Sequence, residues 1–338
     1  MKNLSAKRVI QSISSGTAIS KDKISKSGLY PVYGGGSKIG YCSDYNCDDV
    51  VLVGRVGSCG HITLVKDKCW ATDNALIIKT KGETSYLAYL LTSTDMTPLI
   101  SQTAMPLLTS GKIKELILPY TFDITEQRQI VHFLDRKCSA IDTAIEKTKE
   151  SIEKLEEYKK AVITEAVTKG LDPDAKMKDS GVEWIGEVPE GWKIIKTKYL
   201  FHILKRIAGE EGYDVISITQ NGLKIRNTKS NEGQVAADYS NYQFVYPGDF
   251  AMNHMDLLTG WVDLSTLFGV TSPDYRVFRR ISEKVNNDYY RYVFQSLYFN
   301  KVYYGLAKGV AEMGRKRLQA PVFKDVRLPF PPSEEQKV

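Results

Sequence analysis

The second half of this 338-residue sequence repeats the pattern of the first half after a shift of about 200 positions. The segments 48–79 and 248–279 align without a gap, and their glycines and apolar residues fall at matching places. The matched pairs include Asp49 with Asp249, Gly60 with Gly260, Leu64 with Leu264, and Ile77 with Val277. A period of this length far exceeds that of a solenoid repeat. It predicts two copies of a whole domain.

The match continues in the same order farther along the chain. YLAYLLTS at 86–93 corresponds to YYRYVFQS at 289–296, and KELILPY at 114–120 corresponds to KDVRLPF at 324–330. Each copy then closes on a Glu-Gln pair, at 126–127 and at 335–336. Because the order is kept throughout, we interpret the chain as a tandem duplication.

Each copy has the pattern of an α+β domain. Short β-branched or alternating segments such as VVLVG, HITLV and DVISIT lie between glycine-containing turns, and SYLAYLLTS and NDYYRYVFQSLYFNKVYYGL read as helical stretches. We therefore predict the α+β class, with two tandem-duplicated, mixed α/β domains joined by a long coiled-coil helix. The expected boundaries are 1–122 for the first domain, 123–170 for the helix, 171–332 for a linker and the second domain, and 333–338 for the start of a second helix.

The connecting segment carries a heptad pattern. Asp123 with Glu126 resembles a capping box, and Gly170 followed by Pro173 supplies a stop, which gives a helix of about 45 residues and about 65 Å. Apolar residues recur at the two core positions of the heptad, as in a coiled-coil seam. The residues that we expect to meet a partner helix are Val131, Leu134, Cys138, Ile141, Ile145, Ile152, Leu155 and Val162.

The alternative for this segment is a long surface helix packed on one domain. Against it, the apolar stripe is narrow and the other faces are charged, as in EKTKESIEKLEEYKK at 146–160. Such a rod needs a partner helix. The second copy ends with the same helix-starting signal, LPFPPSEEQKV, so a related helix is one source of that partner.

Composition excludes several classes of protein. No apolar run approaches the roughly 18 residues that cross a bilayer, and the N-terminal segment lacks the apolar region of a signal peptide. We therefore expect a cytoplasmic protein without membrane contact. The net charge of +6 permits nucleic-acid binding without requiring it.

The five cysteines argue against a disulfide framework. Their number is odd and they form no C-x-x-C pair, so we expect reduced thiols. A zinc site at Cys42, Cys47, Cys59 and Cys69 is the alternative, but the spacing fits no common zinc motif. These cysteines also have no counterparts in the second copy, and we expect no metal.

The common catalytic motifs are missing from the sequence. It contains no Walker G-x-x-x-x-G-K-[ST], no H-E-x-x-H, no G-x-S-x-G and no Asn-Pro-Pro-aromatic motif. The four histidines are scattered singly. We expect no catalytic residues in this chain.

Several motifs resemble those of one family. EQRQIVHFLDRKCSAID at 126–142 and GVEWIGEVPEGW at 181–192 are specific, and the weaker motifs YPVYGGGSKIGY, GRVGSCG, ISITQNG and LPFPPSEEQ occur in the matching order. In these features the chain resembles the specificity subunit of type I restriction-modification systems over essentially its whole length.

The resemblance implies a non-catalytic subunit of a methyltransferase and endonuclease complex. Each target-recognition domain would read one half of a bipartite site in double-stranded DNA, and the long helix would act as a spacer and dock modification subunits, which carry the DNA methylation chemistry. Restriction subunits would join through the complex. No cofactor is expected in this chain, whereas S-adenosylmethionine, ATP and Mg are expected on the partner subunits.

The sequence departs from the family pattern after Val338, where a second conserved helix would follow. We therefore expect another chain to cover the seam, and self-association through the connecting helix is one form of this. The alternative function is a truncated structural or decoy subunit, which binds modification subunits or a second copy without sequence-specific DNA recognition.

If the chain reads DNA, the first copy offers a glycine loop and polar side chains. Glycine amides in YGGGSK approach phosphate closely, and arginine and asparagine suit guanine and adenine edges. The candidates are Tyr33, Ser37, Lys38, Tyr41, Arg55, Ser58 and Asn74. The alternative for the glycine loop is a tight turn between strands.

The second copy offers a different set of residues. Amide side chains suit adenine, and cations suit phosphate or guanine. The candidates are Gln220, Asn221, Lys224, Arg226, Asn253, His254, Ser272, Arg315, Lys316 and Arg317. The alternatives are a hairpin at Asn221-Gly222 and a solvated basic turn at 315–317.

Overall fold

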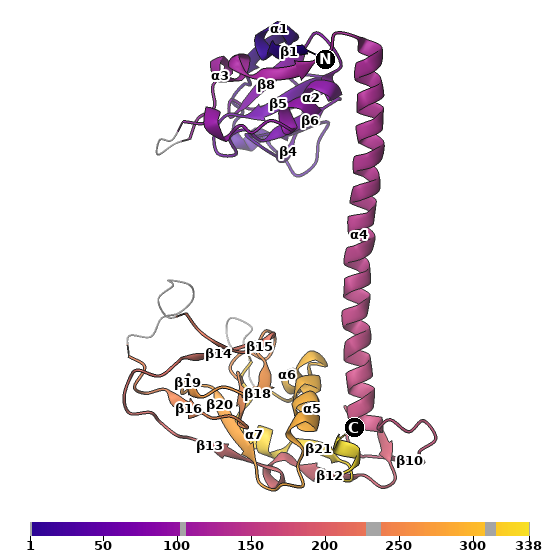
Figure 1. Cartoon of the computed structure of the whole chain (residues 1–338), viewed down its shortest axis with the longest axis vertical. Helices are drawn as coiled ribbons and strands as arrows, with labels where there is room; N and C mark the ends of the chain where they lie inside the picture. Colours follow the sequence, from indigo (N-terminus) through magenta and orange to yellow (C-terminus); the bar gives the residue numbers. More distant parts are fainter. Residues whose placement is uncertain (1, 102–105, 228–237, 308–315, 338) are drawn as a thin grey trace. The chain divides into compact units, whose positions relative to one another are not determined.

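The computed structural model describes residues 2–101, 106–227, 238–307 and 316–337. The chain forms two compact units, residues 1–148 and residues 149–338 (Figure 1). Helix α4, Ile124–Lys169, contributes to both units. This mixed helix and strand content confirms the predicted α+β class with two tandem domains joined by a long helix.

The first unit is built on an antiparallel four-stranded sheet. The strands lie in the order β2-β8-β5-β6, while β1 pairs with β9, and β3 lies between β4 and β7. The strands are β1 Lys2–Ser5, β2 Ile10–Ser15, β3 Tyr30–Tyr33, β4 Lys38–Cys42, β5 Val50–Gly54, β6 Ile62–Val65, β7 Trp70–Ala71, β8 Ala75–Thr80 and β9 Ile117–Tyr120. The helices are α1 Ala6–Val9, α2 Thr84–Thr92 and α3 Ser110–Glu115, with short 3-10 turns at Lys21–Lys23 and Thr97–Leu99.

The second unit repeats this sheet. Its order, β13-β20-β17-β18, is that of the first unit, and β12 pairs with β21 as β1 pairs with β9. The strands are β10 Met177–Asp179, β11 Glu187–Pro189, β12 Lys193–Lys196, β13 Phe201–Leu204, β14 Ile216–Thr219, β15 Gly222–Ile225, β16 Gln243–Val245, β17 Phe250–Met252, β18 Val262–Leu264, β19 Gly269–Thr271, β20 Arg276–Arg280 and β21 Arg327–Phe330. The helices are α5 Asn287–Phe299, α6 Val302–Leu306 and α7 Ala320–Asp325, with 3-10 turns at Thr197–Tyr199 and Glu335–Lys337.

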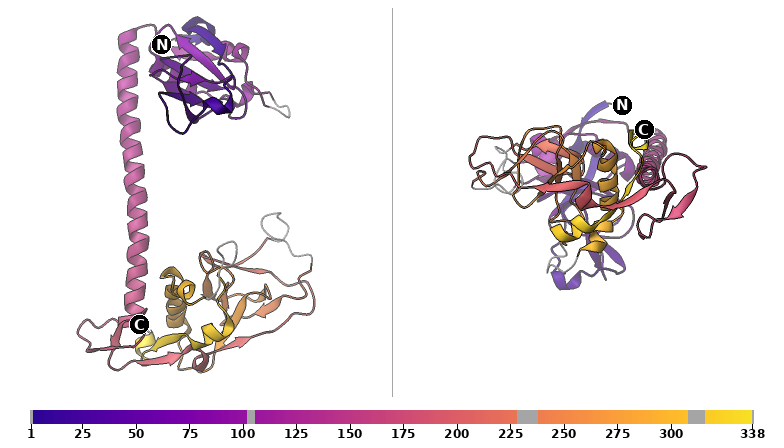
Figure 2. Two further views of the ribbon diagram at one scale, coloured as in Figure 1. Left: turned by 180° about the vertical axis from the view of Figure 1, so that it is seen from behind. Right: turned by 90° about the horizontal axis from the view of Figure 1, so that it is seen from below.

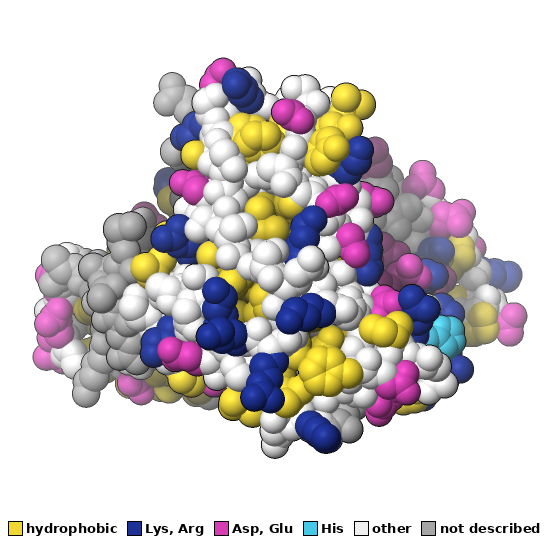
Figure 3. All heavy atoms as spheres, turned by 90° about the horizontal axis from the view of Figure 1, so that it is seen from above, with side chains coloured by type: hydrophobic (Ala, Val, Ile, Leu, Met, Phe, Trp, Pro, Cys, Tyr) yellow, Lys and Arg dark blue, Asp and Glu magenta, His cyan; other side chains and the backbone are white. Residues whose placement is uncertain are grey.

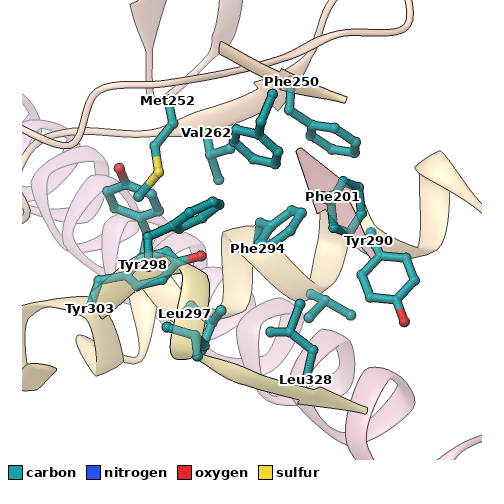
Figure 4. Packing of buried hydrophobic residues seen from close by; sticks show 14 of the residues in the cluster. Phe201, Phe250, Met252, Val262, Tyr290, Phe294, Leu297, Tyr298, Tyr303 and Leu328 are labelled. Carbon is teal, nitrogen blue, oxygen red and sulfur yellow. The ribbon is translucent and has the colours of Figure 1, made fainter. Parts of the chain in front are cut away.

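Aromatic residues form the core of the second unit, where α5 lies beside the sheet (Figure 2). Phe250 and Phe278 stack on neighbouring strands with ring centroids 5.2 Å apart. Phe294 of α5 meets both rings edge-on, and Phe201 closes the cluster from β13 (Figure 4). Burying large rings at the centre stabilises the sheet against its helix.

One glutamine in each unit fixes the start of a helix. The buried Gln127 accepts the backbone N–H of Glu83, the N-cap of α2, at 2.8 Å and donates to the carbonyl of Thr121 at 2.7 Å. Gln336 makes the equivalent contacts in the second unit. The glutamines of the two Glu-Gln pairs are therefore structural equivalents.

The gapless alignment is wrong by one residue in one strand. Val51 pairs with Leu64 and Ile78, and Phe250 pairs with Leu264 and Phe278. Val51 and Phe250 are thus equivalent although 199 positions apart, so Asp49 corresponds to Gly248 and not to Asp249. Both Asp49 (φ 42°) and Gly248 (φ 85°) have left-handed backbone. The reason is a loop after the strand that is one residue longer in the second copy, between Asn253 and Trp261 instead of Gly54 and His61.

The predicted connecting helix runs from Ile124 to Lys169. Asp123 caps it by accepting the backbone N–H groups of Thr125 and Glu126, and Gly170, at φ 76°, ends it. The capping box is only half formed, because the carboxylate of Glu126 accepts the Thr121 hydroxyl instead of turning back to Asp123. The expected second helix at 333–338 is represented by the single turn Glu335–Lys337.

Candidate nucleic-acid interface

Three loops of the first unit converge at one end of its strands. The turn 34–37 between β3 and β4 lies against the loop 55–61 and against Asn74. A Cβ at Gly35 would lie 2.4 Å from the Val56 carbonyl oxygen, and one at Gly36 would lie 2.5 Å from Cβ of Ser58. The glycines are therefore needed for contact between loops. Gly34 donates its N–H to the Ser37 carbonyl at 3.0 Å, in agreement with the tight-turn alternative.

Arg55 organises this cluster. Its backbone N–H donates to the carbonyl of Asn74 at 2.9 Å, and its own carbonyl accepts the N–H of Leu108 at 3.0 Å. Its guanidinium donates to the Ser15 hydroxyl at 3.1 Å. The structure thus brings Asn74 to the loop that carries Arg55 and Ser58.

Lys38 and Tyr41 form a separate pair of interacting side chains on β4. The lysine ammonium donates to the Tyr41 hydroxyl at 2.9 Å and lies 4.6 Å from the ring centroid. This hydrogen bond raises the pKa of Lys38 above its ordinary value, so the lysine stays charged. Tyr33 is half-buried and packs on the cluster around Cys47 and Cys69, and burial raises the pKa of its hydroxyl.

The second unit places His254 where the first unit has Arg55. The carbonyl of His254 accepts the N–H of Leu318 at 3.0 Å, as that of Arg55 accepts the N–H of Leu108. The two candidates, selected separately from the sequence, begin equivalent loops. Because their side chains differ while their backbone contacts agree, the two units present different chemistry on the same scaffold.

His254 is held in its neutral form. Burial, together with the neighbouring cations Arg276 and Arg317, lowers its pKa to about 3. Its Nδ1 atom is enclosed and has no hydrogen-bond partner among the residues that the structure describes. Imidazole in this state has one donor and one acceptor and no charge.

Asn253 and Ser272 shape two loops of the second unit. The Asn253 side chain accepts the N–H of Met255 at 3.2 Å, and its carbonyl accepts the Tyr298 hydroxyl at 2.7 Å. The Ser272 hydroxyl accepts the N–H of Asp274 at 3.3 Å. These contacts hold turns in place.

Arg276 is a site residue that the sequence did not single out. It is only 4% exposed, donates to the Leu318 carbonyl at 2.9 Å, and lies 4.7 Å from the ring centroid of Phe323. Burial lowers its pKa to about 10. Comparison of the two copies could have revealed Arg276, because the first copy has the apolar Leu76 at the equivalent position of its strand.

The hairpin β14–β15 carries Gln220 and Asn221 at its exposed tip. Thr219 pairs with Gly222, so the two-residue loop is Gln220-Asn221 and lies one residue earlier than the predicted Asn221-Gly222 turn. Lys224 is exposed on β15. Arg226 follows the strand. Its positive charge partly offsets the effect of burial, which raises the pKa of Tyr242 and Tyr275.

The predicted basic run at 315–317 is partly described. Lys316 lies 4.3 Å from the ring centroid of Tyr304, and Arg317 is exposed beside His254. Arg315 lies outside the described residues. Another group of basic residues, Lys7, Arg8, Lys112 and Lys114, lies on the neighbouring helices α1 and α3. The face viewed in Figure 3 carries Lys and Arg side chains beside hydrophobic patches.

The four cysteines of the zinc alternative do not gather. Cys42 donates to the Asp44 carbonyl and Cys59 to the Arg55 carbonyl, whereas Cys47 and Cys69 face each other. Within the described ranges, no three His, Cys, Asp or Glu side chains lie close enough together to hold a metal. The helices described here also include none that is long and apolar enough to span a membrane.

The seam of α4 is covered only near its start. Val131 packs on the first core and Leu134 is half-buried. Farther along, Ile141 is 57% exposed, Ile152 is 52% exposed and Leu155 is 64% exposed. Cys138, Ile145 and Val162 are exposed as well. The alternative of a helix packed along one domain is therefore not observed.

A groove of about 1020 Å³ adjoins the seam within the second unit. Leu155, Tyr158 and Val162 form one wall, and Trp192, Tyr289 and Tyr292 form the other. Trp192, the last residue of the GVEWIGEVPEGW motif, donates its indole N–H to Glu335 at 2.7 Å. The motif thus ties the groove to the terminal Glu-Gln pair.

Comparison with known proteins points to one family. Residues 6–157 match the model described as type I restriction modification DNA specificity domain. The type I restriction enzyme MjaVIII specificity subunit of Methanocaldococcus jannaschii is 28% identical over 235 residues, which cover 63% of this chain and 51% of that protein. The type I restriction enzyme EcoprrI specificity subunit of Escherichia coli is 30% identical over 112 residues, or 32% of this chain and 28% of that protein. The chain spans about half the length of the first relative and less of the second.

Solved structures share the fold. The HsdS subunit from Thermoanaerobacter tengcongensis superposes with a TM-score of 0.54 at 14% identity, covering 99% of this chain and 86% of that one. A chain from a structure on complex assembly and conformational transition of the type I R-M system gives a TM-score of 0.63 at 13% identity, covering 99% and 87%. At such identities the likeness concerns the fold alone.

Proposed function

We propose that this chain is a specificity subunit of a type I restriction-modification enzyme and acts as its non-catalytic DNA reader, which the match of residues 6–157 to the DNA specificity domain supports. Each unit reads one half of a bipartite site. The observation that carries this proposal is the equivalence of Arg55 and His254, which open matching loops on two copies of one sheet. Two scaffolds of the same design with different side chains suit two different half-sites.

The side chains at the loops divide into two kinds. Arg55 and Asn74 suit guanine and adenine edges in the major groove, because a guanidinium meets guanine O6 and N7 and an amide meets adenine N6 and N7. Lys38, Lys316 and Arg317 suit phosphates, which position a protein without specifying sequence. In the second unit Gln220 and Asn221 add amides at the tip of a hairpin.

Docking of modification subunits is the second part of the proposal. The exposed seam from Ile141 to Val162 ends in the apolar groove of the second unit. In the first unit, α2 is the counterpart of α5, and its surface is covered by α4. There the hydroxyl of Tyr89 donates to the carboxylate of Asp135 on α4 at 2.5 Å. Tyr292 in the groove is the structural counterpart of Tyr89. Each tyrosine has the same sequence separation from the N-cap of its helix, which is Asn286 for α5 and Glu83 for α2. We infer that a helix of another chain lies in the groove as α4 lies on Tyr89.

The test is selection of DNA from a random pool by the full chain bound to its modification subunit. We expect two short conserved segments separated by a spacer of fixed length and free sequence. Binding without any sequence preference would contradict the proposal and favour the structural or decoy alternative. Mass measurement of the same sample shows whether the modification subunit is bound, so failed assembly is distinguished from failed recognition.

A further inference from the structure

Cys47 and Cys69 face each other inside the first unit. They form an antiparallel bridge in which the N–H of Cys47 donates to the Cys69 carbonyl at 3.2 Å and the N–H of Cys69 donates to the Cys47 carbonyl at 2.9 Å. Their sulfur atoms lie 3.3 Å apart although the residues are 22 positions apart in sequence. The two thiols are therefore in direct contact.

The backbone geometry suits a covalent link. Opposed residues that exchange both hydrogen bonds in an antiparallel pair have Cα atoms about 5.5 Å apart. Disulfides join Cα atoms about 4.4 to 6.8 Å apart, with a sulfur–sulfur bond of about 2.05 Å. Rotation of the two side chains is enough to bring the sulfurs from contact to bonding distance, without moving the strands.

The surroundings favour reaction between these two sulfurs. Cys47 is 5% exposed and Cys69 is fully enclosed, among Val50, Leu52 and Val65. The hydrogen bond from Cys69 lowers the pKa of the Cys47 thiol, whereas the same contact and burial raise that of Cys69. The thiolate, which is the reacting form, is thus favoured on Cys47.

We propose that Cys47 and Cys69 are a disulfide-forming site that a peroxide closes in the first unit. The Cys47 thiolate attacks one peroxide oxygen, the O–O bond breaks, and a sulfenic acid and one water form once a proton is supplied. The sulfur of Cys69 then attacks the sulfenic sulfur, the S–O bond breaks, and the disulfide and a second water form. Two thiols lose two electrons and two protons, and the peroxide is reduced to two waters.

The bond would act on the loops of the first unit. Ala71, two residues after Cys69, pairs with Tyr33, and Tyr33 leads directly into the turn 34–37. Cys47 lies three residues before β5, which leads into the loop of Arg55. The disulfide would therefore join the bases of two converging loops. The second unit has no counterpart, because Gly269 stands at the position of Cys69.

The other cysteines provide internal controls. Cys42 is buried but donates its thiol to the Asp44 carbonyl at 2.9 Å, and Cys59 donates to the carbonyls of Arg55 and Pro106. Cys138 is exposed on α4. Each of these three has a different environment from the facing pair, so the site of oxidation can be assigned.

The test treats the full chain with hydrogen peroxide, then denatures it and alkylates the remaining thiols. We expect the number of alkylated cysteines to fall from five to three, with a dithiothreitol-sensitive crosslink between the peptides of Cys47 and Cys69 in a non-reducing digest. Cys69→Ala should abolish this crosslink, and Cys138→Ala should leave it unchanged. The proposal would be overturned if Cys47 and Cys69 were both still alkylated after Cys138 or Cys59 had been oxidised. A crosslink through Cys42 would overturn it as well. The wild-type crosslink map decides the matter even if a buried variant fails to fold.

Discussion

The side-chain oxygen of Gln336 accepts the backbone N–H of Asn286 at 2.8 Å, and Asn286 is the N-cap of α5. The amide nitrogen of the same glutamine donates to the Pro331 carbonyl at 2.9 Å. One buried side chain thus joins the end of the second unit to the start of its main helix, as Gln127 does in the first unit. The Glu-Gln pair at the close of each copy is explained by this contact.

Replacing Gln336 with alanine should destabilise the second unit by about 1–3 kcal/mol, because the Asn286 N–H and the Pro331 carbonyl would be left buried without partners. The measurement is the urea midpoint and slope of the full chain. Lys337→Ala is the matched control, since Lys337 is exposed and forms an ion pair with Glu334 across one turn. Equal effects of the two substitutions would contradict the role of Gln336.

The neutral state of His254 predicts a pH dependence of stability. Its pKa in the folded state, about 3, lies below the ordinary value of 6.5, so the unfolded state binds the proton more readily. The stabilising contribution is complete above pH 6.5 and is lost as the pH falls towards 3. Between pH 7 and pH 5 this one group should lower the free energy of unfolding by up to about 2 kcal/mol.

The pH effect is isolated by comparing variants. In urea denaturation at pH 7 and pH 5, His254→Gln should lose less stability than the wild type, whereas His61→Gln, at an exposed histidine, should follow the wild type. A His254→Gln protein with the wild-type pH dependence would exclude His254 as the source.

Arg55→Lys should relax recognition of one half-site. Lysine keeps the charge but lacks the forked guanidinium that bonds guanine at two points, so we expect discrimination at one base to fall by about 1–3 kcal/mol. The measurement is selection from random DNA with the modification subunit bound. Ser15→Ala, which removes the partner of the guanidinium, should leave the consensus unchanged. Loss of preference in both half-sites would contradict independent reading.

Replacing Lys316 and Arg317 together with alanine should weaken binding to all sequences alike. If both contact phosphates, the slope of log K against log salt should become shallower by about 1.8. Lys178→Ala is the control, because that lysine lies on the β10–β11 hairpin and donates to Glu190. A changed consensus with an unchanged salt slope would point to base contacts instead.

Replacing Ile145 and Ile152 together with lysine should weaken binding of the modification subunit at least tenfold. Both residues are exposed in this chain, so the free energy of unfolding should change by less than about 0.5 kcal/mol. The measurement is the mass of the complex as a function of concentration. Glu150→Lys with Glu157→Lys adds the same residue type on another face of α4 and should have a much smaller effect. Unchanged assembly of the Ile145→Lys, Ile152→Lys protein would contradict a docking role for the seam.

Much of the architecture could be predicted because it depends on spacing along the chain. The duplication and the helix from Ile124 to Lys169 follow from the placement of apolar residues, glycines and caps, which local physics reads directly. The one-residue error at Val51 and Phe250 arose because an alignment without gaps cannot register an insertion in a loop. Strand pairing revealed it.

The loops were harder to predict because their contacts are tertiary. The close approach of Gly35 and Gly36 to the neighbouring loops depends on tertiary contacts that the sequence does not show. The burial of Arg276 and the contact between Cys47 and Cys69 depend on strands brought together from distant parts of the sequence. The equivalence of Arg55 and His254 likewise appears only through their bonds to Leu108 and Leu318.

The extra residue between Asn253 and Trp261 has a consequence for how such a protein diversifies. The longer loop leaves the pairing of Phe250 with Leu264 the same as that of Val51 with Leu64. An insertion at this point changes the length and reach of the loop without disturbing the hydrogen bonds of the sheet. If each unit reads its own half-site, as we propose, a change in the length of this loop would alter the binding preference of one unit while the other unit keeps its own.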